Sequence, residues 1–509
     1  MVASVSSRAI NRPGPPSPRR FIVLLAFCLL TMTNAWQWIT WSSVSTLVAE
    51  RWGVSYDEVN GLSTIYMYIY ISLAFPAFYI MDRRGLRVAL LIGAFLNLLG
   101  SVVHVSGASL AGRSGYLYAY VGQTFAGVAQ LFTLAVPPLL ATSWFKADEV
   151  SLASALGVAS NQCGSALGLG ITGIVVTSIE EDLAPYLWVQ TVLCLLSFVL
   201  ILIFVSDVPP LDPKEPLPPI DVDSPTHRHK KHPDRSSFES ADPTDHPHHA
   251  SFKTDALLYL NTVRSILSSR SVVLLSLSYG ISTGVFYAYA TFLSQLLPTW
   301  STPSSSSLGL VVILVGLCGS LVGGAVLDKG KAFQPLNRLY VFTAFLGMCL
   351  WFFVSKSFPE SRAGLYVVGA IVGFSLTGSI SIGFEYAVEL TYPLNEGTVA
   401  GVLNVAANVG GVVLILLGSG MNKWLSAEDS INAINAYMLT FEGVAALLVC
   451  VAINDTAYKR QLAQETQEKT GLMEPMLENQ DEEGKGEEGR YGATDAVTID
   501  VVKVVASGK

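Results

Sequence analysis

Two short charged stretches, far apart in the chain, interrupt long apolar runs in the same way. The first reads Asp82-Arg83-Arg84-Gly85-Leu86-Arg87, and the second reads Gly324-Ala-Val-Leu-Asp328-Lys329-Gly330-Lys331. Asp82 and Asp328 are 246 residues apart. A further pair of similar stretches begins at Glu149 and Glu396, which are 247 residues apart. Near-equal offsets at independent places predict a duplicated unit.

The runs around these stretches predict membrane-crossing helices, each of which needs about 20 mostly apolar residues. In the first half they lie near 21–48, 59–80, 86–107, 116–142, 150–177 and 184–206. In the second half they lie near 271–297, 307–327, 337–355, 364–391, 398–420 and 431–452. The sequence therefore predicts an all-α polytopic membrane protein with twelve transmembrane helices in two six-helix, pseudo-symmetric halves, an arrangement typical of transporters.

The charge distribution supports this division. Of the 509 residues, 51% are hydrophobic and 14% are charged, against about 25% charged in soluble proteins. The charges concentrate in an N-terminal segment (1–20), a central loop (207–264) and an acidic tail (453–509), which flank two bundles at 21–206 and 265–452. We expect the tail to be disordered. This composition and the net charge of −8 exclude a soluble enzyme, a nucleic-acid-binding protein and a secreted disulfide scaffold.

Lysine and arginine predict the orientation in the membrane. They gather in the N-terminal segment, in the central loop and in the loop after the second helix of each half. The opposite side keeps only Arg51, Arg113, Lys356, Arg362 and Lys423. We therefore expect both termini and the central loop to be cytoplasmic.

Aromatic residues in the first span of each half predict a substrate site. Trp38 lies well inside its span, beside Asn34 and Gln37, which indicate a polar, bundle-facing surface. Tyr287 lies within two residues of the repeat equivalent of Trp38, so both rings are expected at similar depth. Tryptophan at the membrane interface is the alternative explanation for such rings.

Amide side chains at mid-membrane extend this candidate site. Span 5 contains Asn161 and Gln162, and span 11 contains Asn404 and Asn408 on one helix face. Hydrogen bonds between helices are the alternative role for Asn161 and Gln162. No Asp, Glu, His, Lys or Arg lies at mid-membrane in spans 1, 5, 7 and 11. Aromatic faces and amides without a countercharge suit a quaternary ammonium group, although ordinary aromatic packing produces the same composition.

The charged stretches predict a gate at the cytoplasmic face. Its candidate residues are Asp82, Arg83, Gly85, Arg87, Asp328, Lys329, Glu385 and Glu389. Glycine permits a tight turn there, and the acids and bases can pair across helix ends. The alternatives are bases that merely follow the positive-inside rule, and a ligand role for Glu385 and Glu389. The pattern offers no role for Glu442 in span 12.

Several motifs resemble a known family. Asn34-Ala-Trp-Gln-Trp-Ile, Met81-Asp-Arg-Arg-Gly-Leu-Arg87, Asn161-Gln162 and Gly383-Phe-Glu-Tyr-Ala-Val-Glu-Leu-Thr-Tyr-Pro393 resemble the feline leukaemia virus subgroup C receptor-related transporters of the major facilitator superfamily. The resemblance implies the major facilitator fold and transport of choline and ethanolamine, or of haem. The family's choline-binding Trp, Gln and Tyr match Trp38, Gln162 and Tyr287. Asn408 departs from the family, which commonly has Gln there.

The resulting expectation is a transporter, not an enzyme, that moves a choline- or ethanolamine-type cation downhill, as a uniporter, by alternating access. A haem or vitamin carrier and a non-transporting nutrient receptor are the alternatives. Haem is disfavoured because six of the seven histidines lie in the central loop. We expect no cofactor, no bound metal and no nucleic-acid partner, and a monomer in the bilayer.

The polar segments bear on location. The tail stretch Glu468-Lys-Thr-Gly-Leu472-Met473 resembles an acidic dileucine sorting signal, although such short patterns arise often by chance. We expect the plasma membrane, with an endolysosomal or vacuolar membrane as the alternative. The run Thr226-His-Arg-His-Lys-Lys-His232 is expected to be a solvated linker, with loose metal binding as the alternative.

Overall fold

The computed structural model describes residues 18–145, 149–206, 263–330, 332–391, 394 and 396–452. All of them belong to one unit of the chain, Met1–Ala457. The N-terminal segment up to residue 17, most of the central loop and the tail from residue 453 lie outside the described residues. The predictions for the His-rich run, the disordered tail and the sorting signal concern those residues.

The apolar runs form helices, because a helix satisfies its own backbone hydrogen bonds in lipid. The first half contains α2 (Arg19–Ser43), α3 (Ser45–Trp52), α4 (Tyr56–Gly107), α5 (Gly112–Gln130), α6 (Pro137–Trp144), α7 (Val150–Ala166), the π-helical turn η1 (Leu167–Ile171), α8 (Thr172–Val175) and α9 (Leu183–Phe204). The second half contains α11 (Arg270–Leu296), α12 (Thr302–Gly330), α13 (Phe333–Ser357), α14 (Arg362–Thr391), α15 (Glu396–Trp424), α16 (Ala427–Leu447) and the π-helical turn η3 (Leu448–Ala452). The described residues contain no strand.

Ten stretches of described helix are long and apolar enough to cross a membrane. Two of them come from α4, which breaks at Gly85. The remaining predicted crossings correspond to α5 and to the continuous run α7–η1–α8. The described helices therefore agree with the predicted twelve crossings.

The fourth predicted span, 116–142, is not one continuous helix. Helix α5 ends at Gln130, turns follow, and α6 begins at Pro137. Pro137 and Pro138 have no N–H group, so they cannot continue the hydrogen-bond ladder of α5, but proline is well suited to the first turn of a new helix.

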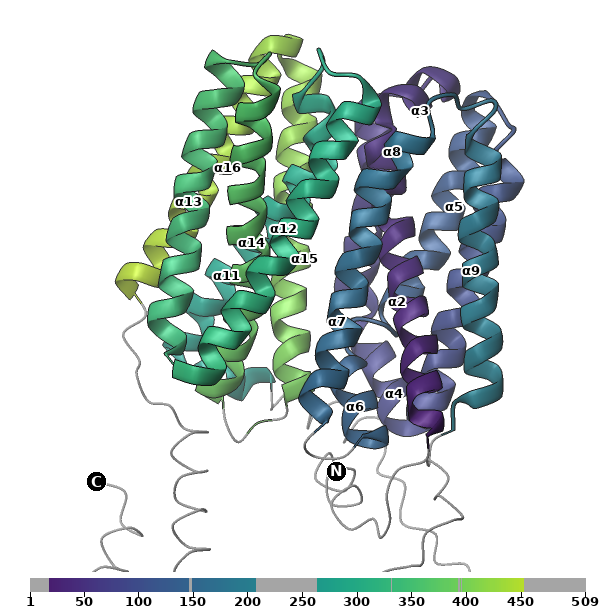
Figure 1. Cartoon of the computed structure of the whole chain (residues 1–509), viewed down its shortest axis with the longest axis vertical. Coiled ribbons are helices and arrows are strands. Elements are labelled where there is room, and N and C mark those ends of the chain that lie inside the picture. Colours follow the sequence, from purple (N-terminus) through teal and green to yellow (C-terminus); the bar gives the residue numbers. More distant parts are fainter. Residues whose placement is uncertain are drawn as a thin grey trace, which may run out of the picture. The chain divides into compact units, whose positions relative to one another are not determined.

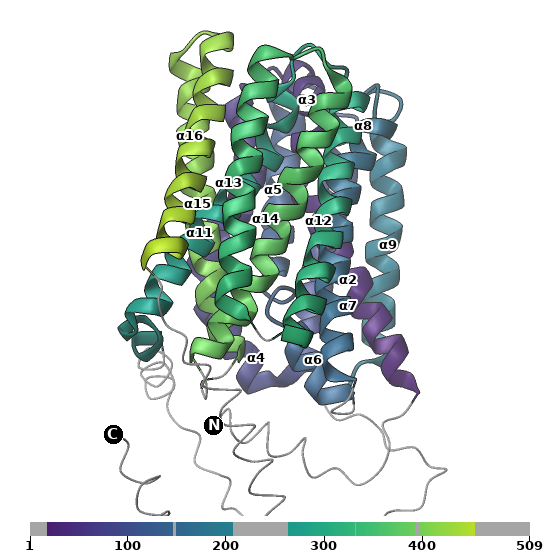
Figure 2. The ribbon, with the colours of Figure 1, turned by 60° about the vertical axis from the view of Figure 1, so that its left-hand side comes forward.

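The two halves lie side by side, the first coloured purple to blue and the second green to yellow (Figure 1). The motif end of the bundle is the end at which α2 begins and α4 breaks; the outer end carries α3 and α8 (Figures 1 and 2). Across the boundary, α12 packs against α7, η1 and α8, α15 packs against α4, and α11 packs against α2. The first helices of the two halves therefore meet at the centre of the molecule.

The charged stretches form turns at the motif end. Gly85 has φ 81° and ψ 177°, a backbone conformation that only glycine adopts readily, and it reverses the chain within α4. In the second half, α12 ends at Gly330 and α13 begins at Phe333. The repeat seen in the sequence thus corresponds to equivalent turns in the two halves.

Candidate functional site

An aromatic ring of the first half contacts an aromatic ring of the second half at the centre of the molecule. The rings of Trp38 on α2 and Tyr287 on α11 lie edge to face, with centroids 5.2 Å apart and planes at 72°. Trp38 is 7% exposed and Tyr287 is partly buried. Gly411 on α15 allows this packing, because a Cβ atom there would lie 2.9 Å from the Tyr287 ring and 2.7 Å from the sulfur of Met67. The predicted ring pair therefore forms a direct contact between the halves.

The two predicted amides of span 5 differ in their contacts. Nδ2 of Asn161 donates a hydrogen bond to the hydroxyl of Thr31 on α2, at 3.1 Å. Gln162 is half-buried, and its side chain makes no hydrogen bond with another described residue. Asn161 thus joins two helices, as the structural alternative proposed, whereas the amide of Gln162 retains its capacity to bind a ligand.

The two predicted amides of span 11 form a pair within α15. Nδ2 of Asn408 donates to the backbone carbonyl of Asn404 at 2.7 Å, and Asn408 is 2% exposed. Asn404 is half-buried. The side-chain carbonyl of Asn408 is therefore the part of this amide that remains for a donor on a ligand.

Helix register gives the depth of these groups. Asn161 bonds to Thr31, and Gly168 packs against the backbone of Trp36, so α7 and α2 run parallel. Gln162 precedes Gly168 by six residues and therefore lies about 9 Å nearer the motif end. Asn408 precedes Gly411, the residue that touches Tyr287, by about one turn. The rings thus lie toward the outer end of the candidate site and the amides toward the motif end.

Asn34 and Gln37 face the interior of the first half rather than the boundary between halves. Both Nδ2 of Asn34 and Nε2 of Gln37 donate to Oδ1 of Asn97 at 3.0 Å, and Nδ2 of Asn34 also donates to the carbonyl of Ala126 at 2.8 Å. All three amide residues are at most 1% exposed. Asn97 was not among the predicted site residues. The sequence signal that could have identified it is the presence of a polar residue within the apolar run 86–107.

The predicted gate residues lie at the motif end. Arg87 and Glu385 are exposed, and Glu389 is buried at 3% exposure. The side chains of Asp82, Arg83, Asp328 and Lys329 lie outside the described residues. The structure places Gly85 at the turn, but the acid–base pairing predicted for this gate stays a prediction.

A hydrogen-bond cluster joins the halves at the outer end. Nε2 of Gln295 donates to Oδ1 of Asn60 at 2.7 Å, and Nδ2 of Asn60 donates to the hydroxyl of Ser419 at 3.3 Å. The hydroxyl of Ser294 donates to the carbonyl of Ser42 at 2.8 Å and lies 2.9 Å from that of Ser45. Nδ2 of Asn422 donates to Oε1 of Gln295 at 3.0 Å. We call the residues joined by these bonds the outer cluster: Ser42, Ser45, Asn60, Ser294, Gln295, Ser419 and Asn422.

Four hydrogen bonds of the outer cluster join a residue of the first half to a residue of the second half. The sequence analysis did not predict the outer cluster, because serine and asparagine at the ends of membrane spans are also typical of the membrane interface. No group of three or more His, Cys, Asp or Glu side chains that could hold a metal ion occurs in the described part of the chain.

Comparison with known families identifies the kind of protein that this arrangement belongs to. The family model described as Major Facilitator Superfamily matches residues 22–415. The chain belongs to this superfamily. It is therefore an integral, multi-pass membrane transporter and not an enzyme, and its fold is the expected twelve-helix major facilitator fold.

Curated relatives confirm the resemblance to the feline leukaemia virus subgroup C receptor-related transporters. The chain is 31% identical to the choline/ethanolamine transporter FLVCR1 of Mus musculus over 458 residues, covering 86% of this chain and 76% of the relative. It is 31% identical to human choline/ethanolamine transporter FLVCR2 over 411 residues, covering 79% and 71%. It is also 32% identical to the uncharacterized MFS-type transporter C09D4.1 of Caenorhabditis elegans over 458 residues, covering 88% and 71%.

Solved structures agree on the fold. A D-xylose-proton symporter superposes with a TM-score of 0.62 at 13% identity, covering 86% of this chain and 99% of that one. A bacterial homologue of the human lysosomal transporter Spinster, in an inward-facing and unoccupied conformation, superposes with a TM-score of 0.61 at 12% identity, covering 85% and 96%. At these identities the likeness shows the fold alone.

Proposed function

We propose that this transporter moves a choline- or ethanolamine-type organic cation downhill across the membrane by alternating access. The observation that carries the proposal is the contact of Trp38 with Tyr287, since it sets one aromatic ring from each half at a shared boundary. A cation held between the rings would attract both halves at once. The choline/ethanolamine transporters FLVCR1 and FLVCR2 among the relatives support this class of substrate.

The residues take distinct roles in this proposal. The faces of Trp38 and Tyr287 attract the ammonium group, each by about 0.5–2 kcal/mol. The amide of Gln162 orients the polar end of the ligand, and the carbonyl of Asn408 assists it. Asn161 and Asn404 line the same region, Asn161 while holding α7 against α2.

Alternating access requires two ends that open in turn, with the bundles 21–206 and 265–452 as the moving bodies. The outer cluster supports a closed outer end, because its hydrogen bonds join the halves there. At the motif end, the turns after the second helix of each half would act with Glu385 and Glu389 as the second gate. Opening of the outer end then requires the outer cluster to break.

The positive-inside distribution of lysine and arginine supports a cytoplasmic motif end, with both termini and the central loop on that side. We propose the plasma membrane as the location and a monomer as the working unit. Downhill transport is supported by the absence of Asp, Glu, His, Lys and Arg at mid-membrane in spans 1, 5, 7 and 11.

Uptake of radiolabelled choline into proteoliposomes tests the proposal. Trp38→Ala and Tyr287→Ala should each lower uptake at least about tenfold at low substrate, since one ring of the pair is lost. Gln162→Ala should raise KM with a smaller effect on the maximal rate. Trp188→Ala and Tyr118→Ala, which remove exposed rings of the same kinds, are the matched controls.

Each outcome discriminates between functions. Equal uptake by the ring variants and their controls would overturn the site. Choline binding without uptake would favour the receptor alternative, and accumulation driven by an imposed pH gradient would overturn downhill transport.

A further inference from the structure

The second half buries a carboxyl group that the proposed substrate site does not use. Glu442 on α16 is 0% exposed. The hydroxyl of Ser282 on α11 donates to its Oε1 at 2.8 Å, whereas its Oε2 is buried without a hydrogen-bond partner among the described residues. An ionised carboxylate inside a membrane protein is costly unless a cation or several donors stabilise it. A single hydroxyl donor does not supply that stabilisation, so the contacts favour the neutral acid.

The helices packed against α16 bring no described cation to this carboxyl group. These are α11, α13, α15 and η3. On α11 the nearest titratable group along the helix is Tyr279. On α13, Nε of Arg338 donates to the carbonyl of Val449 at 3.3 Å, two helical turns beyond Glu442. Tyr289 lies on the same face of α11 as Ser282, two turns nearer the outer end, and packs against Trp351. The remaining charged or titratable side chains described on these elements are Arg270, Tyr287, Tyr340, Cys349, Lys356, Lys423 and Cys450.

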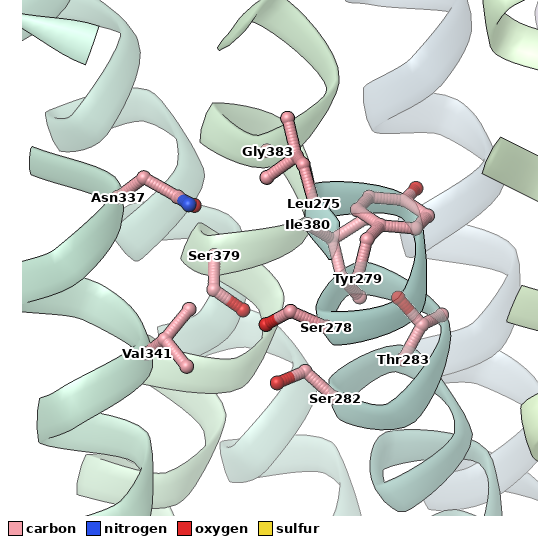
Figure 3. Close-up of a pocket in the computed structure, with 10 residues that line it drawn as sticks. All are labelled: Leu275, Ser278, Tyr279, Ser282, Thr283, Asn337, Val341, Ser379, Ile380 and Gly383. Carbon is pink, nitrogen blue, oxygen red and sulfur yellow. The ribbon is translucent and has the colours of Figure 1, made fainter. Parts of the chain in front are cut away.

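A small cavity adjoins Ser282. The hydroxyls of Ser278 and Ser282 on α11 and of Ser379 on α14 point into the same space, and the amide of Asn337 on α13 points toward it from the other side (Figure 3). Its volume is about 10 Å³, which is room for roughly one water molecule. Nδ2 of Asn337 is buried without a hydrogen-bond partner among the described residues. The three hydroxyls donate to Ala445, Glu442 and Leu376, so the cavity offers a single water-sized occupant one donor, Nδ2 of Asn337, and the hydroxyl oxygens as acceptors.

The same contacts tie α16 to the helix that carries a proposed substrate-binding ring. One turn from the Ser282 contact, the hydroxyl of Ser278 donates to the carbonyl of Ala445 at 2.9 Å. Tyr287 follows Ser282 on α11 by five residues, or about 7 Å along the helix axis. A charge on Glu442 would require water or polar groups to enter between α11 and α16, which would displace α11. Because Tyr287 lies on α11, it would move with the helix.

We propose that Glu442, together with Ser282 and the adjoining cavity, is a proton-binding site whose loss of the proton loosens the contact between α11 and α16 and slows transport. The proton is bound and released on the motif-end side, because Asn337 lies one turn inside that end of α13. The site modulates the transporter and carries no proton across the membrane.

Two measurements test the proton site, and only one of them rests on the proposed function. pH-dependent infrared difference spectra of the reconstituted protein should contain the C=O band of a protonated carboxyl group that disappears at high pH. Glu442→Gln should remove this band, and Glu428→Gln, which changes an exposed glutamate on the same helix, should leave it. A band that persists in Glu442→Gln, or that is absent at every pH in the wild type, would overturn the proposal whatever the substrate is.

Choline uptake against pH, with the same pH on both sides, is the second measurement. Above the pH at which the site loses its proton, wild-type uptake should fall by about tenfold per pH unit, as expected for the release of a single proton. Glu442→Gln mimics the neutral acid and should retain uptake without this decline, whereas Glu428→Gln should follow the wild type. Ser282→Ala, which keeps the carboxyl group, should move the midpoint of the decline.

The uptake outcomes separate the proton site from competing explanations. An unchanged pH profile in Glu442→Gln would overturn the proposal. Uptake that responds to replacement of Na⁺ by K⁺ at constant pH, and only when Glu442 is present, would overturn it in favour of a metal-cation site. If no variant transports choline while the infrared band behaves as expected, the proposed substrate fails and the proton site stands.

Discussion

The two halves share a scaffold but bury different polar groups. In the first half, Asn34 and Gln37 meet Asn97 in a network of neutral amides. At the repeat offset of 247 residues, the second half has Ile281 in place of Asn34 and Ala344 in place of Asn97. It buries instead the ionisable Glu442 against a serine hydroxyl.

A duplicated fold thus constrains the positions of helices rather than the chemistry of the interior. Amides that bond to one another hold helices together without responding to pH, whereas a lone carboxyl group changes its charge. We therefore assign the amide network of the first half a fixed role and the Glu442 site of the second half a pH-responsive one.

The largest effect is expected in the amide network of the first half. Asn97→Ala leaves the donors of Asn34 and Gln37 short of an acceptor, which should lower the free energy of unfolding by about 1–3 kcal/mol. Asn435→Ala in the second half removes the single acceptor of the Trp351 indole N–H (3.0 Å) and should cost less. Thermal unfolding in detergent measures both variants. Equal losses would contradict the contrast between the two interiors.

The next effect is expected where the halves meet. Both hydrogen bonds of Asn60 in the outer cluster join the halves, whereas Gln295 has one such bond, because its bond to Asn422 lies within the second half. At about 1 kcal/mol per bond, Asn60→Ala should shift the equilibrium toward an open outer end by up to about 30-fold, and Gln295→Ala by about fivefold.

Spin labels at positions 181 and 428, one exposed site in each half, measure this shift as a longer distance distribution. Asn435→Ala is the control, because its bond lies within the second half. An unchanged distance distribution in Asn60→Ala, or an equal shift in Asn435→Ala, would contradict the role assigned to the outer cluster.

A smaller effect is expected from conservative changes at the ring pair. Trp38→Phe and Tyr287→Phe keep an aromatic face, and tryptophan attracts cations best. Trp38→Phe should therefore raise KM for choline about two- to fivefold, and Tyr287→Phe should raise it less. Uptake kinetics check this order. A larger effect of Tyr287→Phe would show that the second half contributes its hydroxyl rather than its ring.

The smallest effect is expected at a loop of the first half. The backbone N–H of Ser178, then the hydroxyl and N–H of Thr177, lower the pKa of Asp182. Because the folded pKa is the lower one, the stabilisation is present above the unfolded value and is lost as pH falls through the folded pKa. Asp182→Asn should slightly lower the unfolding temperature at pH 7 and leave it unchanged in acid. An equal difference at both pH values would contradict this assignment.

Particular residues show how far the sequence leads. The offset between Asp82 and Asp328 predicted equivalent turns, and Gly85 adopts the glycine conformation that such a turn needs. Trp38 and Tyr287 were predicted at similar depth, and their rings are in contact. Asn34 and Gln37 lie close to Trp38 along the chain but face the interior of the first half, because successive residues on a helix point about 100° apart. The local sequence does not show that their partner is Asn97.

Hydrophobicity acts on each segment locally, so the amino-acid order alone specifies the number, order and duplication of the crossing helices. The direction that each polar side chain faces depends on how a helix is rotated against neighbours far away in the chain. Packing therefore decided that Asn34 meets Asn97, that Asn60 meets Gln295, and that Glu442 meets Ser282. These pairs join residues 63, 235 and 160 positions apart, distances over which local pattern carries no information about contact.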